Sequence, residues 1–135
     1  MPDISAESRR IVASRARFCC EYCGIAEGDS FLGCEVDHIV SRKHGGSDAV
    51  ENLALACTPC NRSKGTDLGS LDSRGDIVRF FNPRTDQWAE HFRIRNAQIE
   101  SLTNIGAATE RIFDFNSPER IAERIILIRQ GRYPA

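Results

Sequence analysis

The chain has 135 residues, of which 41% are hydrophobic, and this is enough material for the core of one domain. No apolar stretch approaches the roughly 20 residues of a membrane-spanning helix, and no apolar signal-peptide segment follows Met1. We therefore expect neither a membrane protein nor a secreted one, and we predict a cytoplasmic location. The net charge of −1 excludes a protein that holds nucleic acid through one large basic field.

The N-terminal part of the sequence predicts a short surface helix and then a strand. Ser5 is a suitable N-cap for a helix that extends to Arg17. The apolar run over residues 32–40 indicates a strand that ends in the polar pair Asp37 and His38. Because side chains alternate along a strand, these two point in opposite directions unless the chain bends.

A loop, a second strand and a second helix are expected next. Residues 41–52 are polar, contain two adjacent glycines and predict an exposed loop. Residues 53–57 (LALAC) indicate a strand. Thr58 is the expected N-cap of the helix, because the proline that follows it suits a first helical position.

The second half of the chain predicts one β-hairpin and two helices. The β-rich runs over residues 76–81 and 89–95 flank a turn sequence, so we expect them to pair antiparallel. A helix is expected over residues 103–113, capped by its threonine. Ser117 begins the last helix, in which one face carries three isoleucines, Ile121, Ile125 and Ile128.

Two C-x-x-C pairs are the strongest motif in the sequence. In a reducing compartment, paired thiols indicate metal ligands rather than disulfides. Four thiolates match the closed tetrahedral coordination of one structural Zn²⁺, with the ligands Cys20, Cys23, Cys57 and Cys60. The two-residue spacing favours Cys20 over Cys19, and Cys34 is expected in the core. Ordinary buried cysteines or a redox dithiol are the alternative interpretation.

The residues between and around these pairs resemble the HNH, or ββα-metal, endonuclease family. The segments VDHIVSRKHGGSDAVENL and CTPCNRSKG carry the resemblance, which extends over residues 20–65. It implies an α+β fold with a small ββα-metal (HNH) core clasped by the four-cysteine zinc. We expect one domain over residues 1–135, with this nuclease core in residues 1–70 and a C-terminal α/β extension in residues 71–135 packed on it.

The resemblance also implies roles for four polar residues. His38 is the expected general base, and Asp37 is an expected ligand of the catalytic divalent ion. Asn52 holds the loop and orients the base. Asn61 stands where the family name expects histidine, so the pattern is HNN, and its side-chain oxygen is the second expected ligand.

Phosphodiester hydrolysis needs an activated water and a cation on the scissile phosphate. A neutral imidazole can accept the proton of that water. Carboxylate and amide oxygens suit one Mg²⁺ or Mn²⁺ ion. The expected partner is double-stranded DNA, contacted by a modest basic rim that comprises Arg42, Lys43, Arg62 and Lys64. The sequence leaves open whether the chain has a targeting partner or forms a homodimer.

Three interpretations follow from these motifs. The first is a metal-dependent DNA endonuclease. The second is a catalytically inactive zinc module that binds nucleic acid, which the near-neutral charge and Asn61 allow. The third is a redox or purely structural zinc protein. The presence of Asp37, His38 and Asn52 together favours the endonuclease, because a binding module does not need all three.

Overall fold

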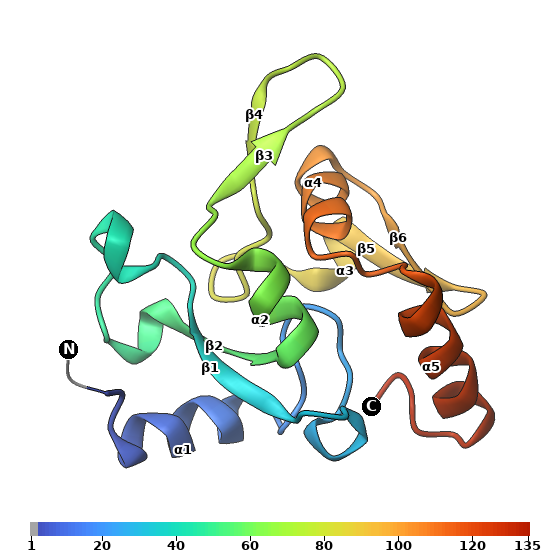
Figure 1. Cartoon of the computed structure of the whole chain (residues 1–135), viewed down its shortest axis with the longest axis horizontal. Coiled ribbons are helices and arrows are strands. Elements are labelled where there is room, and N and C mark those ends of the chain that lie inside the picture. The colour runs from blue at the N-terminus through green and yellow to red at the C-terminus, as the bar shows by residue number, and fades with distance from the viewer. Residues whose placement is uncertain (1–2) are drawn as a thin grey trace.

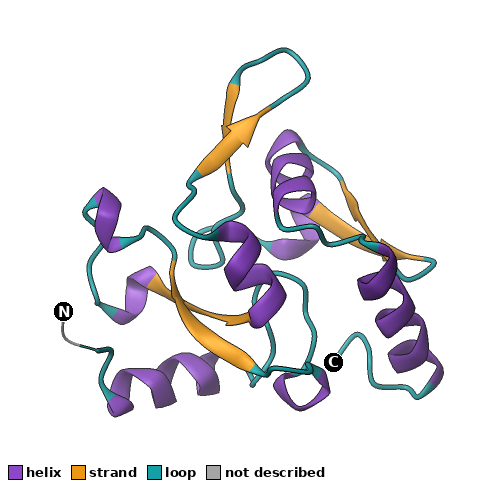
Figure 2. Cartoon of the chain, in the orientation of Figure 1, coloured by secondary structure: helices purple, strands orange, loops and turns teal. Residues whose placement is uncertain are grey.

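The computed structural model describes residues 3–135, and Figures 1 and 2 show an α+β arrangement of helices and two-stranded antiparallel sheets. The first half contains α1 (Ala6–Arg15), β1 (Cys34–His38), β2 (Leu53–Cys57), α2 (Thr58–Lys64) and three short 3₁₀ turns, η1 (Glu27–Asp29), η2 (Arg42–His44) and η3 (Val50–Asn52). The second half contains β3 (Gly69–Leu71), β4 (Ile77–Arg79), α3 (Trp88–His91), β5 (Phe92–Arg95), β6 (Gln98–Ser101), α4 (Asn104–Ile112) and α5 (Pro118–Arg129). The predicted α+β class is confirmed.

The first half folds as the local sequence signals predict. The Ser5 hydroxyl accepts a hydrogen bond from the backbone amide of Ser8, so Ser5 caps α1 as expected. Strand β1 pairs antiparallel with β2, and α2 packs on both strands (Figure 1). The predicted cap of α2 is wrong by one residue. Cys57 is the N-cap, because the Thr58 hydroxyl instead donates to the carbonyl of Gly33.

The predicted pairing of residues 76–81 with residues 89–95 is wrong. Strand β4 pairs with β3, and β5 pairs with β6, so the chain forms two separate hairpins. In the first turn the Asp72 carboxylate accepts bonds from the amides of Arg74 and Asp76, which closes β3 onto β4. In the second turn Asn96 and Ala97 both have positive φ, as a two-residue type I′ turn requires.

Both C-terminal helices begin at their predicted caps, and the face of α5 that carries the isoleucines is not its buried face. Thr103 and Ser117 cap α4 and α5 through their hydroxyls. The buried residues of α5 are Arg124 and Leu127, whereas Ile125 and Ile128 are exposed. The arginine is buried because its guanidinium satisfies backbone carbonyls. Within residues 3–135, no helix is long and apolar enough to cross a membrane.

One hydrophobic cluster joins the two halves of the chain. From the first half it contains the four C-x-x-C cysteines and Tyr22. Its members from the second half include five phenylalanines and one isoleucine, namely Phe80, Phe81, Phe92, Phe113, Phe115 and Ile99. Phe113 is fully buried, and its ring contacts the rings of Tyr22, Phe80 and Phe115. These phenylalanines therefore pack in the core. A smaller cluster of Val12, Leu53 and Leu55 holds α1 against β2.

Phe113→Ala should destabilise the metal-loaded protein by about 3–5 kcal/mol, because it removes a fully buried ring at the junction of the two halves. Urea unfolding measures this loss. Phe31→Ala is the control, since Phe31 is 93% exposed and its truncation should change stability by less than about 0.5 kcal/mol. Equal effects of the two substitutions would contradict the assignment of the core.

Candidate active site and metal centre

The four C-x-x-C cysteines form one compact, buried cluster. Their sulfur atoms lie within 4.8 Å of one another, and the sulfurs of Cys23 and Cys57 are 3.6 Å apart. Tetrahedral coordination with Zn–S bonds near 2.3 Å places the sulfurs about 3.8 Å apart. The donor set therefore fits one Zn²⁺. Cys19 and Cys34 are half-buried and lie outside the cluster, so Cys20 rather than Cys19 joins the other three thiols.

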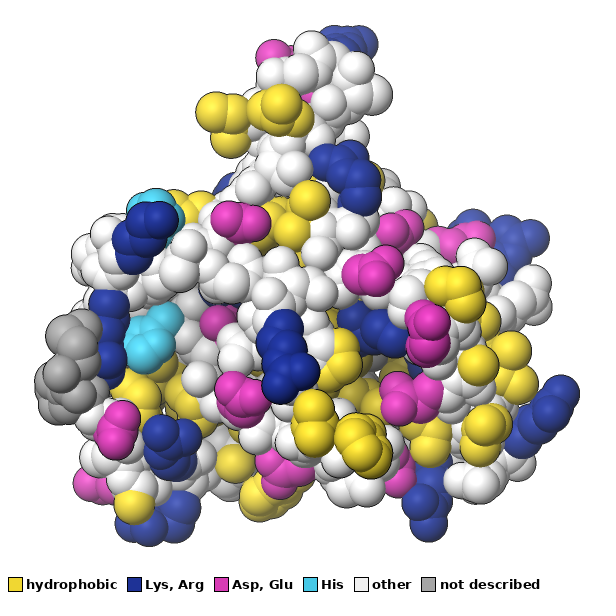
Figure 3. Space-filling view, in the orientation of Figure 1, with side chains coloured by type: hydrophobic (Ala, Val, Ile, Leu, Met, Phe, Trp, Pro, Cys, Tyr) yellow, Lys and Arg dark blue, Asp and Glu magenta, His cyan; other side chains and the backbone are white. Residues whose placement is uncertain are grey.

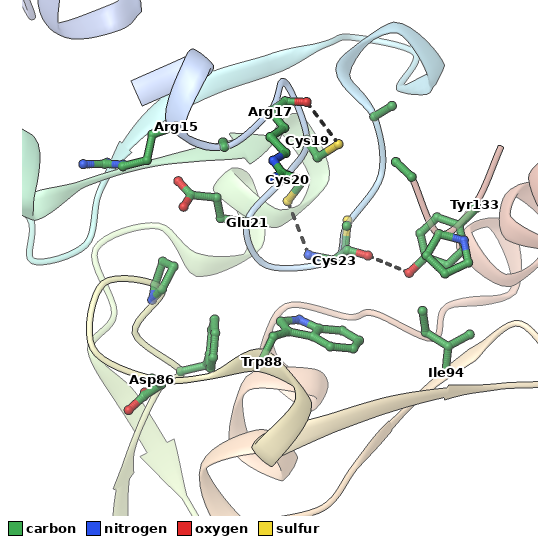
Figure 4. A pocket seen from close by; sticks show the side chains of 17 residues that line it. Arg15, Arg17, Cys19, Cys20, Glu21, Cys23, Asp86, Trp88, Ile94 and Tyr133 are labelled. Carbon is green, nitrogen blue, oxygen red and sulfur yellow. Dashed lines mark hydrogen bonds between the residues drawn. The ribbon is translucent and has the colours of Figure 1, made fainter. Parts of the chain in front are cut away.

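Local backbone geometry brings these sulfurs together. The amide of Cys23 donates to the sulfur of Cys20 over 3.4 Å, and Gly24 closes the turn with a φ of 82° (Figure 4). Cys57 ends β2, and Cys60 follows three residues later in the first turn of α2. In the metal-free cluster, burial raises the pKa of the Cys20 thiol. Because zinc binds thiolates, metal loading must displace such protons.

A seam of four polar side chains lies between β1 and α2. The Asn61 amide donates from Nδ2 to Oε2 of Glu35 over 2.9 Å. One helical turn later, Nζ of Lys64 lies 3.2 Å from Oδ2 of Asp37. Glu35 and Asp37 share one face of the strand, and Asn61 and Lys64 share one face of the helix. The two pairs are therefore neighbours along the same seam.

Asp37 is enclosed at the inner end of this seam. Its side chain is 5% exposed, and the phenol of Tyr22 donates to Oδ2 over 2.9 Å. Lys64 is only 3% exposed and also donates to the carbonyl oxygen of His38. Burial raises the pKa of the Asp37 carboxyl, and the Lys64 ammonium opposes this shift. A cation thus already compensates this carboxylate.

The seam supplies oxygen donors of the kind that a hard divalent ion prefers. Two carboxylates, Glu35 and Asp37, stand beside the amide of Asn61, whose Oδ1 takes no part in the bond to Glu35. Carboxylate and amide oxygens are typical Mg²⁺ and Mn²⁺ ligands. The chemistry of this donor set fits such an ion.

His38 lies on the opposite side of β1 and contacts a carboxylate of the following loop. Its Nε2 is 2.8 Å from Oδ1 of Asp48. The two oxygens of this carboxylate each accept one hydrogen bond from the guanidinium of Arg42. The bonds from Arg42 and His38 lower the pKa of Asp48 to about 2. An ionised carboxylate only accepts, so Nε2 carries the hydrogen and Nδ1 is the basic nitrogen.

Asn52 holds the loop that presents His38. Its Oδ1 accepts from the amide of Val40, and its Nδ2 donates to the carbonyls of Val40 and Ser47, each over 2.8–2.9 Å. A Cβ atom at Gly46 would lie 1.7 Å from the Val40 carbonyl oxygen, so only glycine fits there. The loop is therefore tied closely to the end of β1.

The structure separates the predicted site residues into two groups. The β1–β2 ladder contains no bulge between Cys34 and His38, so Asp37 and His38 keep their opposite directions. Asn61 contacts Glu35 rather than Asp37. Glu35 was missed by the sequence reasoning, although its position two residues before Asp37 places it on the same strand face. No local signal identified Asp48 as the partner of His38.

The four predicted basic residues lie in different environments. Lys43 and Arg62 are exposed, Arg42 is paired with Asp48, and Lys64 is buried against Asp37. Acidic and basic side chains are interspersed over the face shown in Figure 3, which agrees with the near-neutral total charge. Lys64 therefore reaches a phosphate only if it leaves Asp37.

Asn52→Ala should lower the free energy of unfolding by about 1–3 kcal/mol, because it leaves three backbone groups without their partners. Urea unfolding gives the change, and hydrogen exchange at the Val40 amide should become faster. Asn61→Ala removes one exposed bond and serves as the control. An unchanged exchange rate at Val40 in the Asn52 variant would show that the loop does not depend on this side chain.

Comparisons with known proteins agree with this geometry. The sequence model of the HNH endonuclease family matches residues 20–67, which include the cysteine cluster, the seam and His38. The chain is also 31% identical over 111 residues to the CRISPR-associated endonuclease Cas9 of Corynebacterium diphtheriae. That match covers 78% of this chain, and the chain spans only 10% of that relative's length. Residues 20–67 of this chain therefore form an HNH endonuclease domain.

Proposed function

We propose that this chain hydrolyses phosphodiester bonds of double-stranded DNA, with His38 as general base and one divalent metal ion at the scissile phosphate. The orientation of His38 is the observation that carries the proposal. Its Nε2 is fixed by an ionised carboxylate that Arg42 holds in turn, so Nδ1 is free to accept a proton. A solvated strand-end histidine has no need of this arrangement.

His38 is expected to take a proton from the attacking water at Nδ1. Asp48 then stabilises the imidazolium that forms, because its carboxylate faces the opposite nitrogen. Asn52 keeps the loop and the strand end in register while the charge changes. These residues bind no metal in this scheme, so they act on the nucleophile alone.

Asp37 and Asn61 are the proposed protein ligands of one Mg²⁺ or Mn²⁺ ion. When bound, the ion neutralises charge on the scissile phosphate and on the leaving oxygen. Glu35 accepts from Nδ2 of Asn61 and thereby leaves Oδ1 out of that bond. Lys64 competes for Asp37, so the affinity for the ion should be low without a phosphate ligand.

DNA contact is assigned to the basic side chains around the seam. Lys43 and Arg62 are exposed and can reach backbone phosphates directly. Arg42 stays in the predicted DNA-contacting set although its guanidinium bonds Asp48, and Lys64 would become available if an ion replaced it at Asp37. With so few cations, sequence-independent and salt-sensitive binding is expected.

A catalytically inactive nucleic-acid-binding module is the second candidate. One observation favours it, because the ammonium of Lys64 already neutralises the predicted ligand Asp37.

We also infer a reducing, cytoplasmic location, since it would keep the clustered thiols available to zinc. One domain over residues 1–135 is supported by the hydrophobic cluster that joins both halves.

His38→Ala should reduce nicking of supercoiled plasmid by at least about 10²-fold in Mg²⁺ or Mn²⁺, because the water loses its base. EDTA should abolish cleavage by the unsubstituted protein. Gel analysis of plasmid forms measures both effects, with zinc content and circular dichroism confirming the fold.

His44→Ala is the matched control, since His44 is an exposed histidine of the same loop and should not affect the rate. Asp48→Asn should give an intermediate rate, because it removes the charge that fixes the ring. Full activity of His38→Ala would exclude it as the base. Absence of cleavage by folded, zinc-loaded protein in any ion would favour the binding module.

Asn61→His should shift the preferred ion from Mg²⁺ towards Ni²⁺ or Zn²⁺, because imidazole nitrogen is a softer ligand than an amide oxygen. Initial nicking rates across a series of metals give the preference. If the order of metals does not change, Asn61 does not contact the ion.

A further inference from the structure

Helix α5 places an arginine directly against the cysteine cluster. Nη2 of Arg120 donates to the sulfur of Cys60 over 3.2 Å and lies 3.8 Å from the sulfur of Cys57. Nη1 donates to the carbonyl of Phe113 over 2.9 Å, and the guanidinium lies over the ring of Phe115. The orientation of the guanidinium is therefore fixed by contacts on several sides.

The charge of the cluster explains why a cation is placed there. Four thiolates carry more negative charge than one Zn²⁺ neutralises, and all four side chains are buried. Excess charge in a poorly solvated site is costly unless a counter-charge or hydrogen bonds compensate it. Arg120 supplies both, because each N–H that points at sulfur also carries part of the guanidinium charge.

Arg120 also lines a small cavity next to the cluster. A small cavity beside Cys57 is lined by Arg120, Glu123, Pro59 and the exposed loop residues Phe31 and Leu32. A chelator or oxidant that enters this cavity meets the guanidinium next to the thiolate. Shortening the side chain would remove charge compensation and widen access together.

We propose that Arg120 is an outer-shell residue of the zinc site, which retains the metal by hydrogen-bonding the thiolates of Cys57 and Cys60. The loaded cluster in turn fixes α5 to the nuclease core. This inference depends on the zinc site and is independent of nuclease activity. It assigns a metal-retaining function to a residue more than fifty positions from the nearest ligand in sequence.

Arg124 provides an internal comparison on the same helix. It lies one turn after Arg120 and is 3% exposed. Its guanidinium donates to the carbonyls of Ala97 and Phe115 and to the side chain of Asn116. Arg124 therefore anchors α5 through backbone carbonyls, whereas Arg120 contacts sulfur. Substitutions at the two positions separate helix docking from metal retention.

The test compares Arg120→Met, Arg120→Lys and Arg124→Met in the full-length, zinc-loaded chain. Zinc transfer to an excess of a chromogenic chelator gives the release rate. Arg120→Met should release zinc about 10- to 100-fold faster, as is typical when an outer-shell partner of a metal ligand is lost. Arg120→Lys should fall between it and the unsubstituted protein, because lysine keeps the charge but not the planar donors.

Replacing zinc with cobalt(II) gives an absorption band whose position does not respond to the docking of the helix alone. Loss of N–H···S bonds makes the thiolates more electron-rich, so the sulfur-to-cobalt charge-transfer band should move to longer wavelength in Arg120→Met. Arg124→Met should lower the melting temperature and leave the band in place. Equal release rates for the two methionine variants, or an unmoved band in both Arg120 variants, would overturn the proposal. If Arg120→Met does not fold, the position of the same band in Arg120→Lys tests the proposal.

Discussion

The four-thiol cluster is the constraint on which the rest of this structure depends. It joins the turn at residues 20–23 to the junction of β2 and α2, and so closes the segment that contains Glu35, Asp37, His38 and Asn52, while Asn61 and Lys64 follow directly on α2. A zinc ion bound there contributes folding free energy directly, because the unfolded chain has no preformed site. With the cluster in place, the short β1–β2 hairpin does not need a large apolar interior of its own.

The C-terminal extension is attached to the same point. The indole of Trp88 donates to the carbonyl of Tyr22. The phenol of Tyr133 donates to the carbonyl of Cys23 (Figure 4). Arg120 adds its contact with the sulfurs. Residues far apart in sequence therefore converge on the cysteine cluster and on the turn that carries its first pair. The extension completes the core around the metal centre, while the β3–β4 hairpin projects away from it (Figure 1).

This arrangement leaves the candidate active site at the edge of the core. Asp37 is enclosed and paired with Lys64, whereas His38 is held at the surface by Asp48. Both residues lie on β1, which pairs with β2 and packs against α2; β2 ends at Cys57 and α2 contains Cys60. Positioning by short anchored elements suits hydrolysis, because the base and the ion must keep a fixed separation.

The sequence alone determined which four cysteines cluster and which segment matches the nuclease family. The C-x-x-C spacing selected four of six cysteines, and the caps Ser5, Thr103 and Ser117 marked helix starts, because these signals act within a few residues. The motif over residues 20–65 identified the family, and the match over residues 20–67 agrees with it.

Only the tertiary structure decided the strand partners in the second half and the buried face of α5. The turns at Asp72 and at Asn96–Ala97 determine which strands pair in the two hairpins. In the sequence these turns are less conspicuous than the β-rich runs beside them. The buried face of α5 depends on arginines that donate hydrogen bonds to backbone carbonyls and to thiolates. The spacing of apolar residues along the helix does not reveal such partners. Long-range polar contacts depend on where distant segments meet, so local sequence does not encode them.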